Sequence, residues 1–311
     1  MKQPPSVQIW SATPTPLTAD LTIDLPSVGK MIDEAVASRI QGVFLAGTCG
    51  EGPWLPDRER VRLVRAVATE AAGRLKIAVQ VTDNSVPRIL ENIRQAEEAG
   101  ADYAIIAAPA TFMNATPERV AALFIEAADT SPIPVGIYDL GRHRPVMIPE
   151  DRLKEVYLRP NVHLVKDSSG SPSRRAAALE ARKAKPTLRL FNGDEFRCVE
   201  YLEAGYDGCM FGGAVATAGQ LSQIAAAFAK GDLDEARRLE ADMKKALFGI
   251  YGGEQIACWL TGLKYYLVRR GLFSSASSYL GYPLTEACRA FIESYAATAS
   301  ANNEAATRAG R

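Results

Sequence analysis

The stretch Val162–Gly170, with the sequence VHLVKDSSG, decides how the rest of the chain is interpreted. Alternating and β-branched apolar residues run into a Ser/Gly turn, a pattern typical of a buried strand. Lys166 stands at the end of this strand, where burial disfavours a charged ammonium and favours a neutral amine. Such an amine attacks carbonyl carbons and forms Schiff bases. The alternative is a lysine that extends past the strand end, with its ammonium in water.

Composition and charge restrict the class of protein. The 311 residues suffice for one large α/β barrel or two ordinary domains. Lys plus Arg, 36 residues, equal Asp plus Glu, 36 residues, so the formal net charge is zero. This balance lacks the positive charge of a nucleic-acid or acidic-membrane binder, and we expect neither partner. We expect no signal peptide, because residues 1–5 lead into no long apolar segment, and no apolar run approaches the roughly 18–20 residues of a membrane span.

The cysteines indicate the compartment. They are odd in number and form no CxxC pair, which fits reduced thiols better than a disulfide framework. We therefore expect a cytoplasmic protein. The five residues are Cys49, Cys198, Cys209, Cys258 and Cys288.

Short apolar runs alternate with longer amphipathic segments along the chain. Helical periodicity separates the runs, for example over Arg60–Ala71, Arg88–Ala99 and Glu118–Ala128. Proline near a first turn and glycine after a last turn mark helix ends, and Thr116 is a candidate N-cap. The expected strands are Val7–Trp10, Val43–Ala46, Ile77–Val81, Tyr103–Ala107, Val135–Tyr138, His163–Val165, Leu188–Phe191 and Gly208–Phe211.

Eight strands joined by crossovers of helical length imply parallel pairing. The closed arrangement of eight parallel βα units is the (β/α)8 TIM barrel, of about 250 residues. We predict this barrel over residues 1–230, additional C-terminal helices over residues 231–298 and a disordered tail over residues 299–311. A doubly wound open sheet is the second choice, because no GxGxxG motif follows the first strand. Two similar segments, Glu98–Tyr103 and Glu203–Gly208, suggest a repeated helix-to-strand unit.

In such a barrel the active site gathers at the C-terminal ends of the strands. Lys166 ends the sixth expected strand and Tyr138 ends the fifth, so the phenol can approach the amine from the neighbouring strand. After the second strand, the backbone N–H groups of the Gly-rich turn Gly47–Gly52 suit a carboxylate or phosphate, and Thr48 adds a hydroxyl. The turns after the seventh and eighth strands are Asn192–Glu195 and Gly212–Gly213.

Each of these features has an alternative without a ligand. A Gly-rich turn after a strand is often only a turn, and a Tyr at a strand end is often a core aromatic whose hydroxyl faces water. Asp194 is a candidate cap for a helix that begins near Glu195. The combination favours catalysis, because the turn, Tyr138 and Lys166 all fall at strand C-termini and converge on one mouth.

The chain resembles the dihydrodipicolinate synthase / N-acetylneuraminate lyase family of class I aldolases. The resemblance extends from about Ile9 to about Ser294. The matching segments are Ala12–Pro14 after the first strand, Gly47–Glu51 against the family's G-[TS]-T-G-E, Tyr138, Val165–Gly170 around the Schiff-base lysine, Phe191–Asp194 and Gly205–Gly213.

The resemblance implies a lyase that needs neither a metal nor an organic cofactor. Lys166 attacks the keto carbon of pyruvate or a longer 2-oxo acid, and the iminium accepts electrons during C–C bond formation, C–C cleavage or loss of water. Tyr138 transfers protons as general acid and base and is steered by the Thr48 hydroxyl. The turn at Thr48 and Cys49 holds the substrate carboxylate. A homo-oligomer, either a tetramer or a dimer, is also implied.

Three positions depart from the family's synthases. Cys49 replaces the second Thr of the turn, and a thiol is a poor donor in a proton relay. Residues 109–114, with Phe112 as a candidate substrate contact, lack the Tyr that these synthases contribute to a neighbouring subunit. His143 occupies the place of an Arg that holds the second substrate, and Arg142 and Arg144 flank it. His143 is either a substrate contact or an ordinary loop histidine.

These departures favour an aldolase or lyase for a hydroxylated 2-oxo acid. The N-G-D-E segment resembles the sugar-hydroxyl contacts of the family's sialic-acid lyases, so Gly193, Asp194 and Glu195 are candidate substrate contacts, together with Gly212. One alternative is a 4-hydroxy-tetrahydrodipicolinate synthase, which joins pyruvate to aspartate semialdehyde. Another is a family member that binds a 2-oxo acid without turnover, against which the retained lysine and tyrosine argue.

Overall fold

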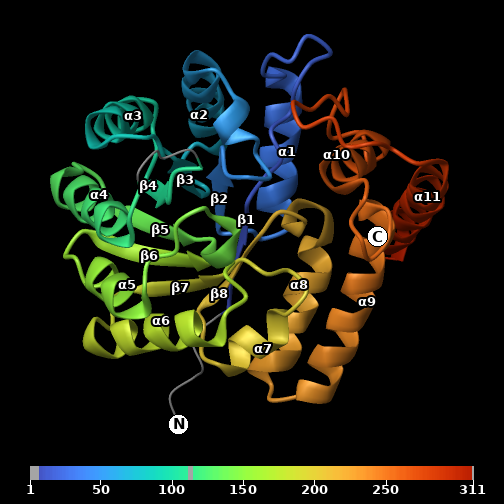
Figure 1. Ribbon diagram of the computed structural model, residues 1–311. Helices are drawn as coiled ribbons and strands as arrows, with labels where there is room; N and C mark the ends of the chain where they lie inside the picture. The colour runs from blue at the N-terminus through green and yellow to red at the C-terminus, as the bar shows by residue number, and fades with distance from the viewer. Residues whose placement is uncertain (1–6, 111–114, 310–311) are drawn as a thin grey trace.

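The chain forms a closed barrel of eight parallel strands (Figure 1), as the computed structural model shows for residues 7–110 and 115–309, with side chains described up to residue 298. Each strand pairs with the next in sequence, and β1 pairs with β8 to complete the ring. The predicted TIM barrel is therefore confirmed; β4 and β8 match the expected ranges, and the other strands differ from theirs by one or two residues at their ends. They are β1 (Gln8–Ser11), β2 (Gly42–Leu45), β3 (Lys76–Gln80), β4 (Tyr103–Ala107), β5 (Val135–Asp139), β6 (Val162–Asp167), β7 (Arg189–Asn192) and β8 (Gly208–Phe211).

A helix follows each strand and covers the outside of the barrel (Figure 1). Two short 3-10 helices, η1 (Gly52–Trp54) and η2 (Gly141–His143), lie in the turns after β2 and β5. The α-helices of the barrel are α1 (Leu25–Ala37), α2 (Asp57–Ala71), α3 (Val86–Glu98), α4 (Pro117–Thr130), α5 (Glu150–Tyr157), α6 (Pro172–Ala184), α7 (Cys198–Glu203) and α8 (Ala214–Ala229).

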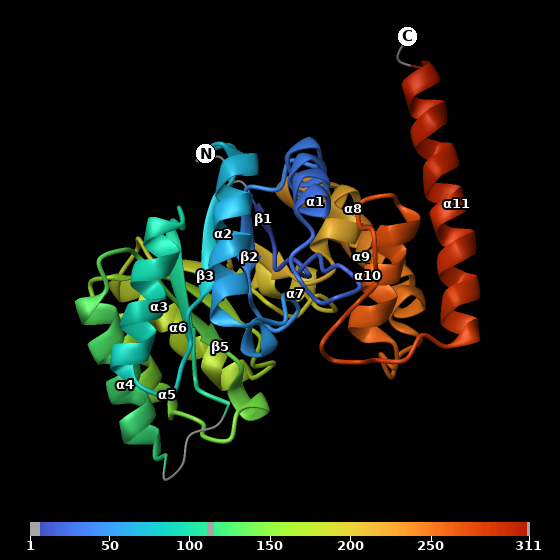
Figure 2. The same ribbon diagram turned by 90° about the horizontal axis from the view of Figure 1, so that it is seen from above.

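Three more helices follow the barrel: α9 (Leu233–Tyr251), α10 (Trp259–Arg269) and α11 (Glu286–Ala309). They lie together beside α8, and Figure 2 shows α11 at the outer edge of this group. The predicted additional C-terminal helices are thus confirmed. Helix α11 continues past residue 299, where the sequence predicted a disordered tail to begin. The domain boundaries at residues 230 and 298 stay a prediction.

Local sequence signals explain where these helices begin. The Thr116 side chain accepts a hydrogen bond from the backbone N–H of Arg119 at 3.3 Å, and Pro117 occupies the first turn of α4. The predicted N-cap is therefore confirmed, because a side-chain oxygen here satisfies an N–H that has no partner within the helix.

The two similar segments, Glu98–Tyr103 and Glu203–Gly208, make the same backbone contacts at two places in the barrel. The N–H of Asp102 donates to Ile77 O at 2.8 Å, and its carboxylate accepts the Ile77 N–H at 2.8 Å. Asp207 repeats both contacts with Leu190, at 2.9 and 2.7 Å. Each Asp therefore closes the start of one strand onto its neighbour. The repeat predicted from sequence is confirmed as a structural unit.

The barrel interior is a packed core beneath the mouth. Every strand contributes at least one inward side chain to it, and glycines make room for Trp10 and Leu164. A Cβ on Gly42 would lie 2.5 Å from the Trp10 ring, and one on Gly136 would lie 2.4 Å from Leu164. The buried apolar residues of this interior cluster are Trp10, Ala12, Phe44, Ala78, Ile105, Ala107, Tyr138, Leu140, Leu164, Phe191 and Met210.

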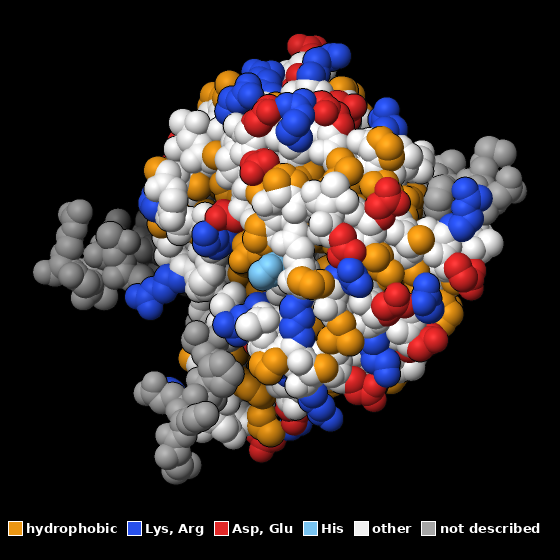
Figure 3. Space-filling model, turned by 90° about the vertical axis from the view of Figure 1, so that its left-hand side faces the viewer, with side chains coloured by type: hydrophobic (Ala, Val, Ile, Leu, Met, Phe, Trp, Pro, Cys, Tyr) orange, Lys and Arg blue, Asp and Glu red, His pale blue; other side chains and the backbone are white. Residues whose placement is uncertain are grey.

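The surface matches the balanced composition. On the face shown in Figure 3, Lys and Arg side chains alternate with Asp and Glu, so charge of one sign does not gather there. Across the described residues, no helix is both long and apolar enough to cross a membrane. All five cysteines are buried, with free thiols.

Candidate active site

Lys166 lies at the end of β6, on the same face of the strand as the inward Leu164. Its side chain is only 4% exposed. The amine lies 4.8 Å from the centroid of the Phe44 ring and 4.4 Å from that of Tyr138. Among the described acidic residues, none forms an ion pair with this amine. The alternative of a lysine extending into water is wrong, because the barrel wall and two rings enclose the amine.

Tyr138 lies directly beside Lys166 across the strand pair. The two residues are register partners between β5 and β6, so their side chains enter the barrel mouth together. The Tyr138 ring is buried and meets the Phe44 ring edge-on, with centroids 5.7 Å apart. The structure therefore brings together the lysine and the phenol that the sequence placed on neighbouring strands.

The residues after this pair, Asp139 and Asp167, face the opposite side of the sheet and are buried. Asp139 accepts hydrogen bonds from Arg174 Nε at 2.8 Å and from Arg174 Nη2 at 2.9 Å. Asp167 accepts the Tyr206 hydroxyl at 2.7 Å, and burial raises the pKa of its carboxyl. Contacts on the outer face of the sheet thus fix the ends of β5 and β6. Sequence reasoning assigned these aspartates no role, although each directly follows a predicted catalytic residue.

The turn after β2 contains an unpaired polar atom. Thr48 Oγ1 is buried and has no hydrogen-bond partner among the described residues. An unpaired buried hydroxyl costs free energy, so a ligand that bonds to it would be favoured. Cys49 is buried beside it, and burial raises the pKa of the thiol. A Cβ on Gly212 would lie 3.1 Å from Cys49 Sγ, so the turn after β8 closes against this one.

Asp194 and Glu195 follow β7, and their carboxylates already bond within the protein. Asp194 accepts the Phe196 N–H at 3.1 Å and Arg197 Nε at 2.7 Å. Glu195 accepts the Tyr251 hydroxyl at 2.7 Å, and burial raises the pKa of its carboxyl. The alternative that Asp194 caps a helix beginning near Glu195 is wrong, because α7 begins three residues later.

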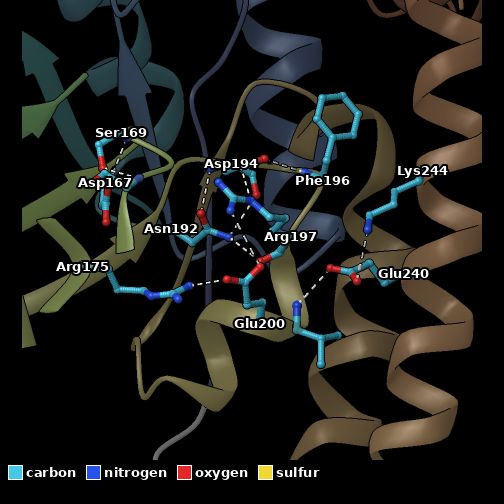
Figure 4. A network of polar contacts seen from close by, with 12 residues as sticks. Asp167, Ser169, Arg175, Asn192, Asp194, Phe196, Arg197, Glu200, Glu240 and Lys244 are labelled. Atoms are coloured by element: carbon cyan, nitrogen blue, oxygen red, sulfur yellow. Dashed lines mark hydrogen bonds and ion pairs between the residues drawn. The ribbon is translucent and has the colours of Figure 1, made fainter. Parts of the chain in front are cut away.

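Figure 4 shows how these contacts fix the segment after β7. The Asn192 side chain accepts the Asp194 N–H at 2.7 Å and donates to Arg197 O at 3.1 Å. Arg175 pairs with Glu200 at 2.6 Å, below Asn192 in this view. Asn192 was not among the predicted site residues. The sequence did indicate its role, because an Asn at a strand end, followed by Gly-Asp, is typical of a turn in which the Asn side chain bonds to the backbone.

The three remaining predicted contact residues after β5 line two different pockets. Arg142 and His143 line one of about 310 Å³, and Arg144 lines another of about 320 Å³ beside the ends of β2, β3 and β4. Burial lowers the pKa of Arg144, whose Nε has no partner among the described residues. The first pocket is also lined by Gly193, Asp194 and Glu195. Phe112 lies outside the described residues.

The fold and the site together define a class of protein. A closed (β/α)8 barrel carries its chemistry at the C-terminal strand ends, and here a buried lysine and a tyrosine lie at two adjacent ends. The chain belongs to the Dihydrodipicolinate synthetase family, whose sequence profile matches residues 5–301. It is therefore a lyase of the class I aldolase type, as the resemblance implied.

Curated relatives support this membership. The chain is 29% identical over 243 residues to the 4-hydroxy-tetrahydrodipicolinate synthase of Kineococcus radiotolerans, a match that covers 78% of this chain and 77% of that protein. It is 28% identical over 201 residues to the enzyme of the same name from Xanthomonas campestris, covering 64% of this chain and 65% of that protein. The second match thus spans just under two thirds of its relative.

Solved structures show the same fold. Dihydrodipicolinate synthase from Bacteroides thetaiotaomicron superposes with a TM-score of 0.83 at 23% identity, covering 93% of this chain and 97% of that one. YagE, a prophage protein of the dihydrodipicolinic acid synthase family from E. coli K12 solved in complex with pyruvate, also has a TM-score of 0.83, at 20% identity over the same shares of both chains.

Proposed function

We propose that this chain forms a Schiff base between Lys166 and a 2-oxo acid, and that it cleaves, condenses or dehydrates that acid. The main support is that the Lys166 amine is buried beside two aromatic rings and has no ion-pair partner among the described acidic residues. An amine held in the barrel without a paired carboxylate can add to the carbonyl carbon of a bound acid. Pyruvate, with which YagE was solved, is the simplest acid of this class.

The neighbouring groups suit this chemistry. The Lys166 nitrogen adds to the keto carbon, the keto oxygen leaves as water, and an iminium remains. One N–H proton of the amine and the phenolic proton of Tyr138, its register partner, pass to the departing oxygen. The Tyr138 phenolate then takes a proton from the carbon next to the iminium, which forms the enamine, and can later return that proton to the same carbon. The unpaired Thr48 hydroxyl and the adjacent N–H groups bind the carboxylate of the acid.

The rest of the substrate lies in the pocket of about 310 Å³ lined by Arg142, His143, Gly193, Asp194 and Glu195. Each carboxylate oxygen there accepts one hydrogen bond and retains a second lone pair, so substrate hydroxyls can still bond to it. This capacity supports a hydroxylated 2-oxo acid. The names of the curated relatives support the second candidate, a 4-hydroxy-tetrahydrodipicolinate synthase.

Borohydride trapping tests the covalent step. Incubation with pyruvate and borohydride should add one reduced pyruvyl group to the peptide containing Lys166, located by mass spectrometry. The variant Lys166→Ala should lose the adduct. Lys154→Ala should retain it, because Lys154 pairs with Glu180 on the outer surface. If the wild-type chain forms no adduct with any 2-oxo acid, the proposal is wrong.

Tyr138→Phe tests the proton transfer. It should slow trapping by about 10²-fold or more without abolishing it, since removal of a general acid costs typically 10²–10⁴-fold. A panel of 2-keto-3-deoxy acids, sialic acid, and pyruvate with aspartate semialdehyde then identifies the substrate. An adduct without turnover on any of them would favour a binding protein. Cytoplasmic location and a homo-oligomer, tetramer or dimer, remain predictions.

A further inference from the structure

The segment between α10 and α11, residues 274–280, is here named the connector. It lies beside α1 and the turn after β2, both of which are far from it in sequence (Figure 1). The Ser274 hydroxyl donates to Asp24, and the Tyr279 hydroxyl donates to Leu21 O at 2.8 Å. The C-terminal helices thus touch the turns at the barrel mouth as well as the outside of the barrel.

The connector and α10 together hold one buried carboxylate, that of Glu51. Lys264 Nζ on α10 donates to its Oε1, and both side chains of this ion pair are completely buried. The other oxygen accepts the Ser278 hydroxyl at 2.8 Å and the Tyr279 N–H at 2.6 Å. Lys264 also donates to Ser277 O at 2.7 Å. Every hydrogen bond to this carboxylate recorded for the described residues therefore comes from the C-terminal part of the chain.

Glu51 lies in the turn that carries Thr48, three residues further along. Its N–H donates to Thr48 O at 3.1 Å, and its φ of 58° lies in the left-handed region that a non-glycine residue adopts at a cost. A Cβ on Gly52 would lie 1.7 Å from Ala46 O, and one on Gly50 would lie 2.8 Å from Ala46 N. A turn packed this closely has little room to move independently, so the placement of Glu51 determines that of Thr48.

Stability alone is a weak reason for such a pair. Desolvating two charges costs about as much as their attraction returns, and well-packed apolar residues often serve equally well. A charge pair does, however, hold a backbone in one place, because moving either partner leaves a buried charge without its partner. The burial of Lys264, which lowers its pKa despite the neighbouring carboxylate, shows how little water reaches this contact.

We propose that Glu51 and Lys264 are positioning residues for the proposed substrate-carboxylate site, through which the C-terminal helices hold Thr48 and Cys49 in place. This inference rests on the proposed Schiff-base function. It assigns the C-terminal helices a role in substrate binding, through a contact that does not include Lys166. Loosening this contact should raise the concentration of 2-oxo acid that half-saturates the enzyme and leave the saturated rate of adduct formation largely unchanged, because Lys166 and Tyr138 stand on other strands.

A matched pair of mild variants gives the first test. Ser278→Ala removes one hydrogen bond to Glu51, whereas Thr261→Ala removes one hydrogen bond between α10 and the backbone of Tyr282, away from the turn. Pyruvate concentration is varied in the borohydride trapping assay, and Tm is measured for both. Ser278→Ala should raise the half-saturating concentration about threefold or more, since the lost bond is to a charged group. Thr261→Ala should lower Tm comparably and leave that concentration unchanged.

Charge variants give the second test. Lys264→Met leaves the Glu51 carboxylate buried without its partner and is expected to fold poorly. The double variant Glu51→Gln/Lys264→Met removes both charges, should fold, and should raise the half-saturating concentration about tenfold while the saturated rate stays within about threefold. A folded double variant with the wild-type half-saturating concentration overturns the proposal. A wild-type chain that forms no adduct instead refutes the Schiff-base function on which it rests.

Discussion

Gly193→Ala should slow adduct formation at Lys166 without replacing any reacting group. The backbone of Gly193 passes directly against the end of β6, where its N–H donates to Asp167 O at 2.7 Å. An added Cβ would lie 2.0 Å from Ser168 Oγ and 3.1 Å from Lys166 Cε. The φ of Gly193 is outside the left-handed region, so the alanine backbone itself is not strained. The methyl group alone causes the effect.

The two contacts have different consequences. The Ser168 hydroxyl must move by roughly 1.4 Å to reach ordinary contact distance, and overpacking of this kind costs about 1–3 kcal/mol. Tm should therefore fall by several degrees. The Lys166 side chain must move by only a few tenths of an ångström. Because a misplacement of about 1 Å can cost 10²-fold in rate, we expect adduct formation to slow about tenfold.

A second variant separates the two effects. Gly193→Ala/Ser168→Ala removes the hydroxyl that clashes most and keeps the methyl group against Lys166 Cε. Its Tm, measured by circular dichroism, should recover toward that of Ser168→Ala alone, while borohydride trapping with pyruvate stays about tenfold slower. Wild-type trapping rates in Gly193→Ala would refute the reasoning, as would full recovery of the rate together with Tm in the double variant.

Two further predictions concern the aspartates behind the catalytic pair. Arg174→Met leaves the Asp139 carboxylate buried without its ion-pair partner, so it should lower the free energy of unfolding by about 3–5 kcal/mol in urea titrations. The control Arg94→Ala breaks only exposed ion pairs and should barely move the urea midpoint. Equal shifts in the two variants would contradict this prediction. Burial raises the pKa of Asp167 above its ordinary value of about 3.9, so between that value and its pKa in the folded protein the folded state binds more protons than the unfolded chain. The contribution of Asp167 to the free energy of unfolding therefore falls as pH rises through that window. Asp167→Asn should make the urea midpoint decline less steeply with pH. If the slope of the midpoint against pH from 4 upward is the same in wild type and Asp167→Asn, Asp167 does not cause the decline.

Much of the fold follows from local patterns. The strand ends were predicted to within one or two residues because each buried strand is a short apolar run bounded by turn residues. Lys166 and Tyr138 were predicted to meet because consecutive strands of a parallel barrel are neighbours, which makes sequence order a guide to spatial order. The division of the arginines could not be predicted, since Arg142 and Arg144 are only two residues apart on η2 and its flank and yet line different pockets.

The amino-acid sequence alone determined the barrel, the family and the place of the lysine, because hydrophobic periodicity and strand order act between residues close together in the chain. Tertiary structure alone decided what surrounds that lysine. The Glu51–Lys264 pair joins residues 213 positions apart, and the carboxylates of Asp194 and Glu195 have internal partners that no local pattern specifies. The physical reason is desolvation: whether a polar group is paired or free for a ligand depends on which distant segments exclude water from it.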